Sequence, residues 1–468
     1  MGCPTSILDE TNYTPMSIPP AALDVAKRCA AGKAMRAQVP RSAHSEWKPA
    51  ANRTDVIDLL EESNRGRVPE LVPIRYGRMS HSPFAFLRGA AAVMAYDLGP
   101  TPTTGLRVQA GGDCHAMNFG AFASPERTLL FDINDFDETL AGPWEWDVKR
   151  LAASVAVAAR HLGGSERECR RAVLDCVRSY RKRLRGFASR TALQVWYARI
   201  PFQSLIRLSK TEAAREVLRR GARDARAHTA AHVIPKLIAN VHQQRRILDM
   251  PPCIYRPTDA GFDAEMRRLF QHYRASLPDD RRVLFDRYHF VDAAVKVVGV
   301  GSVGTRCYVA YFEASANDPL VLQVKEARRS VLEPYTCKCG YANQGHRVVV
   351  GQRLMQSASD IFLGWSRAEE GGYDYYVRQL RDMKGSVPLD GLTPATLGDY
   401  AADCGWALAR AHAKSGDAAP IAGYLGKGDA FDRALATFAD TYADQTERDH
   451  AALVAAVKCG RVKVVEEN

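Results

Sequence analysis

The chain has 468 residues, of which 46% are hydrophobic and 25% are charged, the composition of a globular protein with ample material for a core. Its formal net charge of +11 favours a polyanionic partner such as a nucleotide, but motifs of the common nucleic-acid readers are missing, which disfavours a dedicated nucleic-acid binder. No apolar run reaches the length of about 18 residues that a membrane span needs. The 11 scattered cysteines indicate a reducing, cytoplasmic compartment rather than a disulfide framework.

The first third of the chain mixes helical and strand patterns. In chain order, we expect a helix at 55–63, a helix at 82–89 with Pro83 in its first turn, strands at 106–109 and 129–131, and a helix at 147–162 that ends at Gly163. Asp147 is a candidate N-cap of the last helix, and it is equally able to brace the loop at 111–118.

The rest of the chain alternates between helical and strand-rich segments. Residues 165–290 are mostly helical, and their many arginines are interpreted as solvated helix faces. Strands are predicted at 294–298, 307–312, 320–325 and 346–350. Thr393 as N-cap and Pro394 at the first position predict a helix to about residue 415, and a last helix has Phe431, Leu435, Phe438 and Tyr442 on one face.

The first candidate site lies in two carboxylate-rich loops, each after a predicted strand. Asp113 precedes Asn118 by five residues, and Asp135-Phe136-Asp137 begins 17 residues after Asn118. Mg²⁺ prefers one or two carboxylates and shares the rest of its shell with phosphate and water oxygens. The spacing therefore predicts Asp113 as the proton acceptor for an attacking hydroxyl, and Asn118, Asp135 and Asp137 as ligands of Mg²⁺. The alternative is a polar turn with capping aspartates.

The second candidate site is a glycine-rich segment between two predicted strands. It consists of Gly299, Gly301, Ser302 and Gly304 in the pattern G-x-G-x-x-G, which occurs both in dinucleotide-binding folds and in kinases. In the first group a helix follows the glycines, whereas here a strand follows. The segment therefore predicts a kinase-type loop whose backbone amides cover the phosphates of ATP.

Lys325 ends the next predicted strand, 21 residues after Gly304, where it is expected to reach the α- and β-phosphates of ATP. Glu326 and Glu333 are both candidates for its acidic partner. The alternative is a lysine that keeps an edge strand soluble. The predicted strand at 346–350 either leads to an adenine-reading hinge, with Gln352 and Met355 at the cofactor site, or is an ordinary strand end.

Several polar residues have a simpler interpretation. His81, His346 and His412 are isolated in sequence and are expected at the surface or in the core. Arg88 is able to face either a phosphate or a carboxylate, and the sequence does not decide between them.

These residues make the chain resemble a known bacterial family. The stretches 82–89, 112–120, 134–151, 298–306, 323–327, 373–384 and 404–417 resemble the family catalogued as domain of unknown function 2252. The resemblance covers most of residues 55–450 and implies little about the substrate.

A more distant resemblance carries chemistry. Gly111–Asn118 is similar to the H-G-D-x-H-x-x-N loop of aminoglycoside and choline phosphotransferases, and Asn134–Asp137 with Gly142-Pro143 and Asp147 looks like their metal-binding segment. The resemblance implies Asp113 as base, with Asn118 and Asp135 on Mg²⁺. Gly111 stands where that family has a histidine, a residue that usually supports the loop.

The order of the motifs differs from that of an ordinary kinase, because the loop with Asp113 precedes the glycine loop and Lys325. Residues 403–412 resemble the helix that normally comes before the catalytic loop. A circular permutation accounts for both facts. The expected fold class is thus α+β: a circularly permuted, protein-kinase-like fold with a large helical lobe and a small antiparallel β lobe.

This fold divides the chain into five expected segments. They are an N-terminal extension (1–55), the catalytic-loop and metal-binding part of the large lobe (56–165), its helical part (166–290), the small β lobe (291–365) and C-terminal helices that complete the large lobe (366–468).

The predicted function is Mg-ATP-dependent phosphoryl transfer to a small hydroxylated or amino-bearing molecule. Nucleotidyl transfer with the same parts is a second possibility. A third is a nucleotide-binding pseudokinase scaffold, which Gly111 favours, and a fourth is a nucleic-acid binder that uses the arginine-rich helices. The sequence names neither the acceptor nor the oligomeric state.

Overall fold

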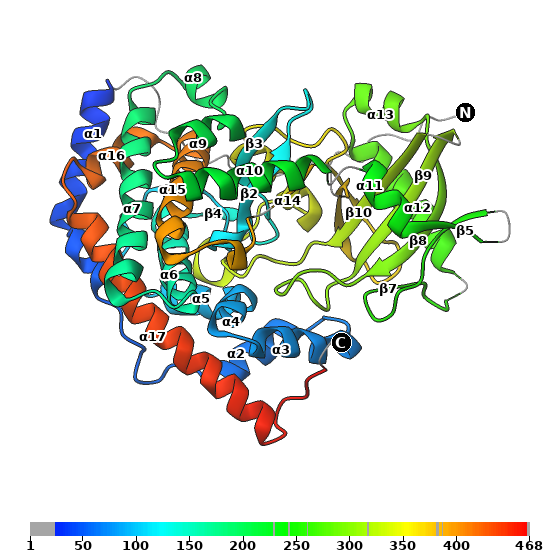
Figure 1. Ribbon diagram of the computed structural model, residues 1–468, viewed down its shortest axis with the longest axis horizontal. Helices are drawn as coiled ribbons and strands as arrows, with labels where there is room; N and C mark the ends of the chain where they lie inside the picture. Colours follow the sequence, from blue (N-terminus) through cyan, green and yellow to red (C-terminus); the bar gives the residue numbers. More distant parts are fainter. Residues whose placement is uncertain are drawn as a thin grey trace.

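The computed structural model of the protein describes residues 24–227, 230–241, 244–259, 261–315, 318–380, 383–385 and 387–465. The fold is α+β, with many helices and small antiparallel sheets, as expected. Figure 1 shows a helical lobe on one side and a β-rich lobe on the other. Within the described ranges, no helix is both long enough and apolar enough to cross a membrane.

The helical lobe is built around four long helices, α6 (Trp144–His161), α7 (Glu166–Ala188), α15 (Pro394–Ser415) and α17 (Ala430–Lys458). They pack against one another around the largest cluster of buried apolar side chains. The expected face of the last helix is buried there, since Phe431, Leu435, Phe438 and Tyr442 all belong to this cluster.

Local sequence explains where these helices begin. The Ser165 side chain accepts from the backbone N–H of Glu168 in a capping box at the start of α7. Thr393 caps α15 and Pro394 is its first residue, which confirms the prediction. Asp147 is not the cap of α6, because the helix begins three residues earlier, at Trp144.

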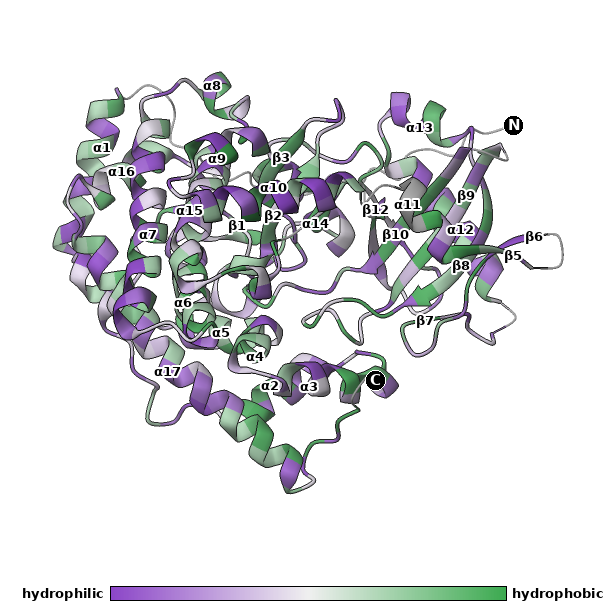
Figure 2. Cartoon of the chain, in the orientation of Figure 1, coloured by the Kyte–Doolittle hydropathy of each residue, from purple (hydrophilic) through white to green (hydrophobic). Residues whose placement is uncertain are grey.

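Shorter helices complete this lobe and its border with the β lobe. They are α1 (Val25–Ala34), α2 (Val56–Asn64), α3 (Val72–Ser80), α4 (Pro83–Gly89), α5 (Ala91–Leu98), α8 (Ala192–Trp196), α9 (Phe202–Leu208), α10 (Glu212–Ala227) and α16 (Ala418–Leu425). Figure 2 shows hydrophilic residues along much of α10. Its Arg219 and Arg223 are exposed and pair with Glu212 and Glu216, as expected of a solvated helix face.

The β lobe contains a six-stranded antiparallel sheet in the order β11-β12-β10-β9-β8-β7. The strands are β7 (Ile254–Tyr255), β8 (His289–Lys296), β9 (Cys307–Ser315), β10 (Asp318–Glu326), β11 (Gly364–Arg367) and β12 (Asp374–Gln379). Helices α12 (Phe262–Ser276) and α13 (Asp279–Phe285) pack apolar residues against this sheet, and α11 (Ala230–Leu237) with the hairpin β5 (Ile238–Val241) and β6 (Gln244–Ile247) contributes to a second apolar cluster. The strands predicted between 294 and 325 are confirmed.

The strand predicted at 346–350 is wrong, because these residues belong to helix α14 (Gln344–Met355). Asn343 caps this helix, since its Oδ1 accepts from the backbone N–H of His346 at 3.0 Å. Val348 and Val349 are buried within the helix, which packs against β11, β12 and α15. A short buried apolar run has the same composition in a strand and in a helix, so its periodicity did not separate the two.

Two small ladders carry the loops of the first candidate site. β1 (Arg107–Ala110) pairs with β4 (Leu140–Pro143), and β2 (Phe119–Ala123) pairs with β3 (Leu129–Ile133). The loop after β1 and the loop after β3 therefore lie side by side. The backbone N–H of Asn134 donates to the carbonyl oxygen of Asn118 at 2.7 Å and joins them.

Candidate functional site

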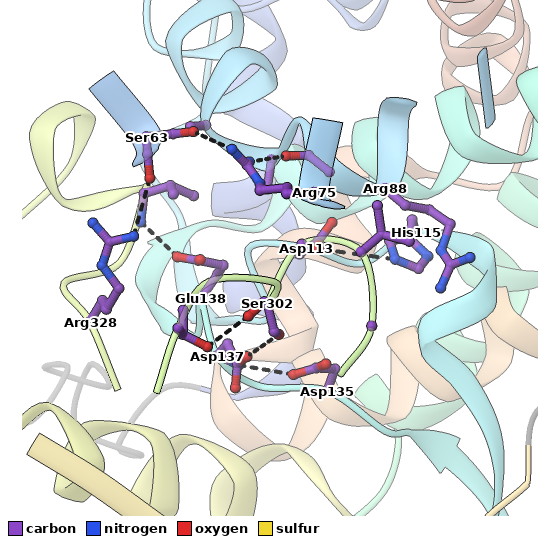
Figure 3. A pocket seen from close by; sticks show the side chains of 18 of the residues that line it. Ser63, Arg75, Arg88, Asp113, His115, Asp135, Asp137, Glu138, Ser302 and Arg328 are labelled. Carbon is purple, nitrogen blue, oxygen red and sulfur yellow. Dashed lines mark hydrogen bonds and ion pairs between the residues drawn. The ribbon is translucent and has the colours of Figure 1, made fainter. Parts of the chain in front are cut away.

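A cleft of about 280 Å³ collects most of the predicted site residues (Figure 3). Its walls come from helices α2 to α5, the loop after β1, the loop after β3, the glycine loop between β8 and β9, and the segment 326–335. Asp113, Asn118, Asp135 and Asp137 line it together with Gly299, Gly301 and Ser302. Residues separated by more than 150 positions in the chain thus share one cavity.

The loop after β1 is held from behind by Asp147, which lies in the first turn of α6. Its two carboxylate oxygens accept from the backbone N–H groups of Gly111, at 2.7 Å, and Gly112, at 2.9 Å. Gly112 has φ +77°, and a Cβ there would lie 2.6 Å from the carbonyl oxygen of Glu138. Of the two roles that the sequence allowed for Asp147, the structure therefore shows the support of the loop at 111–118.

His412 supports Asp147 in turn. Its Nε2 lies 3.1 Å from Asp147 Oδ2, and its Nδ1 lies 2.9 Å from the hydroxyl of Tyr180. Gly111 leaves no space for a side chain, since a Cβ would lie 2.4 Å from Cys114 Sγ. A buried histidine from α15 thus supports the loop, although no side chain is present at position 111. The sequence interpretation of His412 as an isolated residue missed this contact, because its partners lie 265 and 232 positions away.

Asp113 is ion-paired through one oxygen only. Its Oδ1 accepts from Arg150 Nε at 3.0 Å and Nη2 at 2.7 Å, whereas Oδ2 lies 4.0 Å from Nε2 of the buried His115. Burial raises the pKa of Asp113 above its ordinary value, and Arg150 and Arg88 oppose that rise. Asp113 therefore keeps one oxygen able to accept a proton, and its raised pKa makes it a stronger base than a free aspartate. Sequence analysis did not single out Arg150.

Asn118 and Asp135 are the oxygen-bearing pair beside Asp113. The Asn118 amide donates to the backbone carbonyl of Asp113 at 2.7 Å, which orients its side chain. Asp135 remains partly exposed, 3.9 Å from Lys325. Although burial alone would raise the pKa of Asp135, the charges of Lys325, Arg378 and Lys384 hold it below its ordinary value. These two side chains are able to offer one amide and one carboxylate oxygen to a cation.

Asp137 connects three elements at the floor of the cleft. Its carboxylate accepts from Lys325 Nζ at 2.7 Å, Ser302 Oγ at 3.0 Å and the hydroxyl of Tyr376 at 2.6 Å. Burial opposes the charge of Lys325, but Asp135 and Asp137 raise the pKa of this lysine well above its ordinary value. Because three donors already occupy Asp137, it has less capacity left for a metal ion than Asp135 has.

Neither predicted partner of Lys325 contacts it. Glu326 accepts from the backbone N–H and the guanidinium of Arg306, at 2.9 and 3.2 Å. Glu333 accepts from the backbone N–H of Cys339 at 3.2 Å and is not among the residues that line the cleft. The acids that meet Lys325 are instead Asp137 and Asp135, which come from the other lobe.

Gln352 and Met355, predicted at the cofactor site, lie elsewhere. Both are buried in α14 and neither lines the cleft. Gln352 Nε2 donates to Gln356, and Met355 Sδ lies 3.6 Å from the hydroxyl of Thr139. Since residues 346–350 form a helix, the hinge expected after them is absent from that position.

The glycine loop is confirmed as a connection between two strands, β8 and β9. Gly299 and Gly304 have φ +67° and +85°, values that favour glycine. A Cβ on Gly301 would lie 3.2 Å from the carbonyl oxygen of Arg88, so the loop approaches α4 closely. The backbone N–H of Val68 donates to the carbonyl of Gly304 at 2.7 Å and fixes the end of the loop.

Two cations that the sequence did not reveal, Arg378 and Lys384, lie near Asp135. Lys384 Nζ donates to the carbonyl oxygen of Asn134 at 2.6 Å, and burial followed by the charge of Arg378 lowers the pKa of Lys384 well below its ordinary value. Three basic side chains, Lys325, Arg378 and Lys384, thus surround Asp135 and Asp137. An anion bound beside them, such as a phosphate chain, would favour the charged form of Lys384. The described residues include no group of three or more His, Cys, Asp or Glu able to hold a metal by themselves.

Comparison with known proteins places the chain in a family. No curated protein and no solved structure is similar enough in sequence to count as a match. The sequence profile of one family, described as an uncharacterized protein conserved in bacteria (DUF2252), matches residues 67–456. Because this match covers most of the chain, the protein belongs to the DUF2252 family.

Proposed function

We propose that the protein is a Mg-ATP-dependent phosphotransferase that acts on a small molecule. The observation that carries the proposal is that Asp113, Asn118 and Asp135 share one cleft with the glycine loop, and that Lys325 lies 3.9 Å from Asp135. A phosphotransferase needs a base, oxygen ligands for magnesium, and a lysine for the phosphates in this proximity.

The arrangement of the β lobe supports the same proposal. In protein kinases a glycine loop joins two strands, the phosphate-binding lysine lies on the next strand, and a helix follows. Here the glycine loop joins β8 and β9, Lys325 lies on β10 and α14 follows. In this chain the loop with Asp113 comes before these parts rather than after them. We infer that the fold is a circular permutation of the kinase fold.

One part departs from the kinase pattern. The helix after the lysine strand carries a glutamate in kinases, which pairs with the lysine. In this chain α14 carries Arg347, which donates to the backbone carbonyls of Asp137 and Thr139. Lys325 pairs with Asp137 and Asp135 instead. We propose that Arg347 fixes the Asp137 loop and so replaces the glutamate in ordering the lysine.

The residues present fit a bound magnesium nucleotide. Asn118 and Asp135 would hold the metal, and Lys325, Arg378 and Lys384 would offset the phosphate charge. ATP would supply the phosphoryl group that is transferred, and Mg²⁺ would neutralise part of the charge on its oxygens.

Asp113 then has a defined task. As the acceptor hydroxyl oxygen bonds to the γ-phosphorus, the bond from phosphorus to the β–γ bridging oxygen breaks and ADP leaves. The hydroxyl proton moves to Asp113 Oδ2, the oxygen that Arg150 leaves free. Arg150 holds the carboxylate in place through Oδ1.

A thermal-shift titration with ATP tests the proposal at its first step. Ligand at 100 times its Kd stabilises the folded state by about 2.7 kcal/mol, so a shift must appear if the nucleotide binds. We expect a Mg²⁺-dependent shift in the wild type that Asp135→Ala removes. No shift with any nucleotide would reject the proposal, and the product mass separates phosphoryl from nucleotidyl transfer.

A nucleotide-binding scaffold without turnover is the second candidate. The Arg150–Asp113 pair favours it, because a neighbouring cation weakens a base. The raised pKa of Asp113 and the support of the loop by Asp147 and His412 argue for an active enzyme. ATP turnover that Asp113→Asn abolishes would exclude the scaffold.

A further inference from the structure

Three arginines gather on the wall of the cleft formed by α2, α3 and the segment after β10. Arg67, Arg75 and Arg328 all line the cavity, and we name them the arginine cluster. Arg75 donates to Ser63 Oγ at 3.1 Å and Arg328 donates to the Ser63 carbonyl oxygen at 3.1 Å. Figure 3 shows Arg75 and Arg328 both reaching toward Ser63, above Glu138.

Among the described residues, the arginine cluster forms no ion pair with a carboxylate, although the charges of Glu138 and Glu326 act on it from a distance. Every hydrogen bond that its guanidinium groups donate goes to a backbone carbonyl or to a neutral side chain, and no ion pair within 4.0 Å among the described residues includes any of the three. A carbonyl dipole orients a guanidinium but does not neutralise its charge. Arg75 is only 2% exposed, and its Nε is buried without a hydrogen-bond partner.

The three charges act on one another. Burial lowers the pKa of Arg67 well below its ordinary value, and Arg75 and Arg328 lower it further. Burial also lowers the pKa of Arg75, to about 10, with Arg328 acting in the same direction. Like charges brought together in a partly buried wall repel one another, and a bound anion removes that repulsion.

The carboxylates nearest to the arginine cluster are already engaged. Glu138 accepts from the backbone N–H of Val331 at 2.8 Å. Glu326 is paired with Arg306, and Glu62 with Arg65 at 2.8 Å. Glu138 and Glu326 offset part of the charge of the arginine cluster from a distance, but no described carboxylate forms an ion pair with its three guanidinium groups.

We infer that the arginine cluster binds the phosphate or carboxylate group of an anionic small molecule, and that this molecule is the phosphoryl acceptor. The second half of the inference rests on the proposed function. Guanidinium groups match the planar or tetrahedral oxygens of both anions in paired hydrogen bonds. Because the same cleft contains Asp113, an acceptor held at the arginine cluster would present its hydroxyl or amine to that base.

The position of Arg67 adds a consequence for the glycine loop. Arg67 Nη1 donates to the carbonyl oxygen of Val303, and a Cβ on Gly304 would lie 3.1 Å from its side chain. An anion that holds Arg67 would therefore also steady the loop. Binding of the acceptor and binding of the nucleotide are expected to favour each other through this contact.

Calorimetric titration of the nucleotide-free protein tests the inference, with inorganic phosphate and malonate as probes in separate experiments. We expect at least one probe to bind the wild type with a Kd of about 1 mM or tighter, and Arg328→Gln to weaken it by about tenfold. Arg220→Gln, at an exposed position on α10 that does not line the cleft, is the matched control and should bind as the wild type does. Lys384→Gln reports any anion that binds in the nucleotide half, and the binding that Arg328→Gln weakens should persist in this variant.

Three results would overturn the inference: no binding of either probe, full binding in Arg328→Gln, or binding lost in Lys384→Gln but kept in Arg328→Gln. The last result would place the anion in the nucleotide half. If Arg328→Gln fails to fold, Arg67→Lys replaces it, since lysine keeps the charge but cannot donate in a fork. Arg328-dependent anion binding without any response to Mg-ATP would reject the phosphotransferase and keep the anion site.

Discussion

The two ends of the cleft, the carboxylates around Asp113 and Asp137 and the arginine cluster, differ in whether their charges are paired. At the acidic end, Asp113 is paired with Arg150 and Asp137 with Lys325, so each of these carboxylates meets a cation of the protein. In the arginine cluster, no carboxylate of the described residues forms an ion pair with the cations, and Glu138 and Glu326 act on them only from a distance. Where each carboxylate is paired with a cation, the protein itself neutralises the charge. Where several cations lie together without ion pairs, the arrangement indicates that an anion from outside the chain binds there. Four variants test this contrast, because the same kind of substitution should have different effects at the two ends.

The largest effect is expected at Asp113. Asp113→Asn keeps the shape and a hydrogen-bond acceptor for Arg150 but cannot take the proton, so ATP turnover should fall by about 10²- to 10⁴-fold. The Mg-ATP thermal shift should remain. Asp224→Asn, an exposed position on α10, is the control. Unchanged turnover in Asp113→Asn would mean that the acidic end does not perform proton transfer.

Lys325→Met should have the largest effect on stability. Removing one member of a buried pair leaves Asp137 without its cation, while Asp135 still has Arg378 nearby. We expect a loss of about 3 kcal/mol in the free energy of unfolding, at the low end because both carboxylates are partly exposed. Chemical denaturation measures it, and the Mg-ATP shift should disappear as well. Lys338→Met, at an exposed lysine, should change neither. A stable Lys325→Met variant would contradict the view that the acidic end is held by its pairs.

His412 is expected to act as a positioning residue. His412→Leu leaves the Tyr180 hydroxyl without its buried partner and removes one of the contacts of Asp147, which should lower the free energy of unfolding by about 1–3 kcal/mol. Turnover should fall more than nucleotide affinity does, because the loop that carries Asp113 loses its support. His412→Gln retains an amide donor for Asp147 and should recover part of the turnover. Equal losses of turnover and affinity in both variants would indicate a general loss of packing instead.

The smallest effect on stability is expected in the arginine cluster. Arg328→Gln removes hydrogen bonds to two carbonyl oxygens but also removes repulsion from Arg67, so the free energy of unfolding should change by less than about 1 kcal/mol. The comparison with Lys325→Met is the decisive measurement. A loss as large as that at Lys325 would show that the cluster is structural rather than open to a ligand.

Much of the local structure followed from the sequence. Thr393 and Pro394 predict the start of α15 because capping and proline preferences act over one turn. The strands around the glycine loop were equally readable, since alternating and β-branched residues mark strands locally. The candidate loop with Asp113 and Asn118 and the strand that ends at Lys325 were identified from spacing alone. The structure places the loop at the cleft and Lys325 next to Asp135 and Asp137, which line it.

Tertiary structure decided which of these parts meet. Helix α14 was expected as a strand, because a run of buried valines fits either element and only its packing against β11, β12 and α15 distinguishes them. The partner of Lys325 lies 188 residues away, and the support of Asp147 comes from His412, 265 residues away. Local propensity contains no information about such distances. The sequence by itself therefore determined which side chains are able to do chemistry, and the packing of the two lobes determined which charges are paired and which remain open.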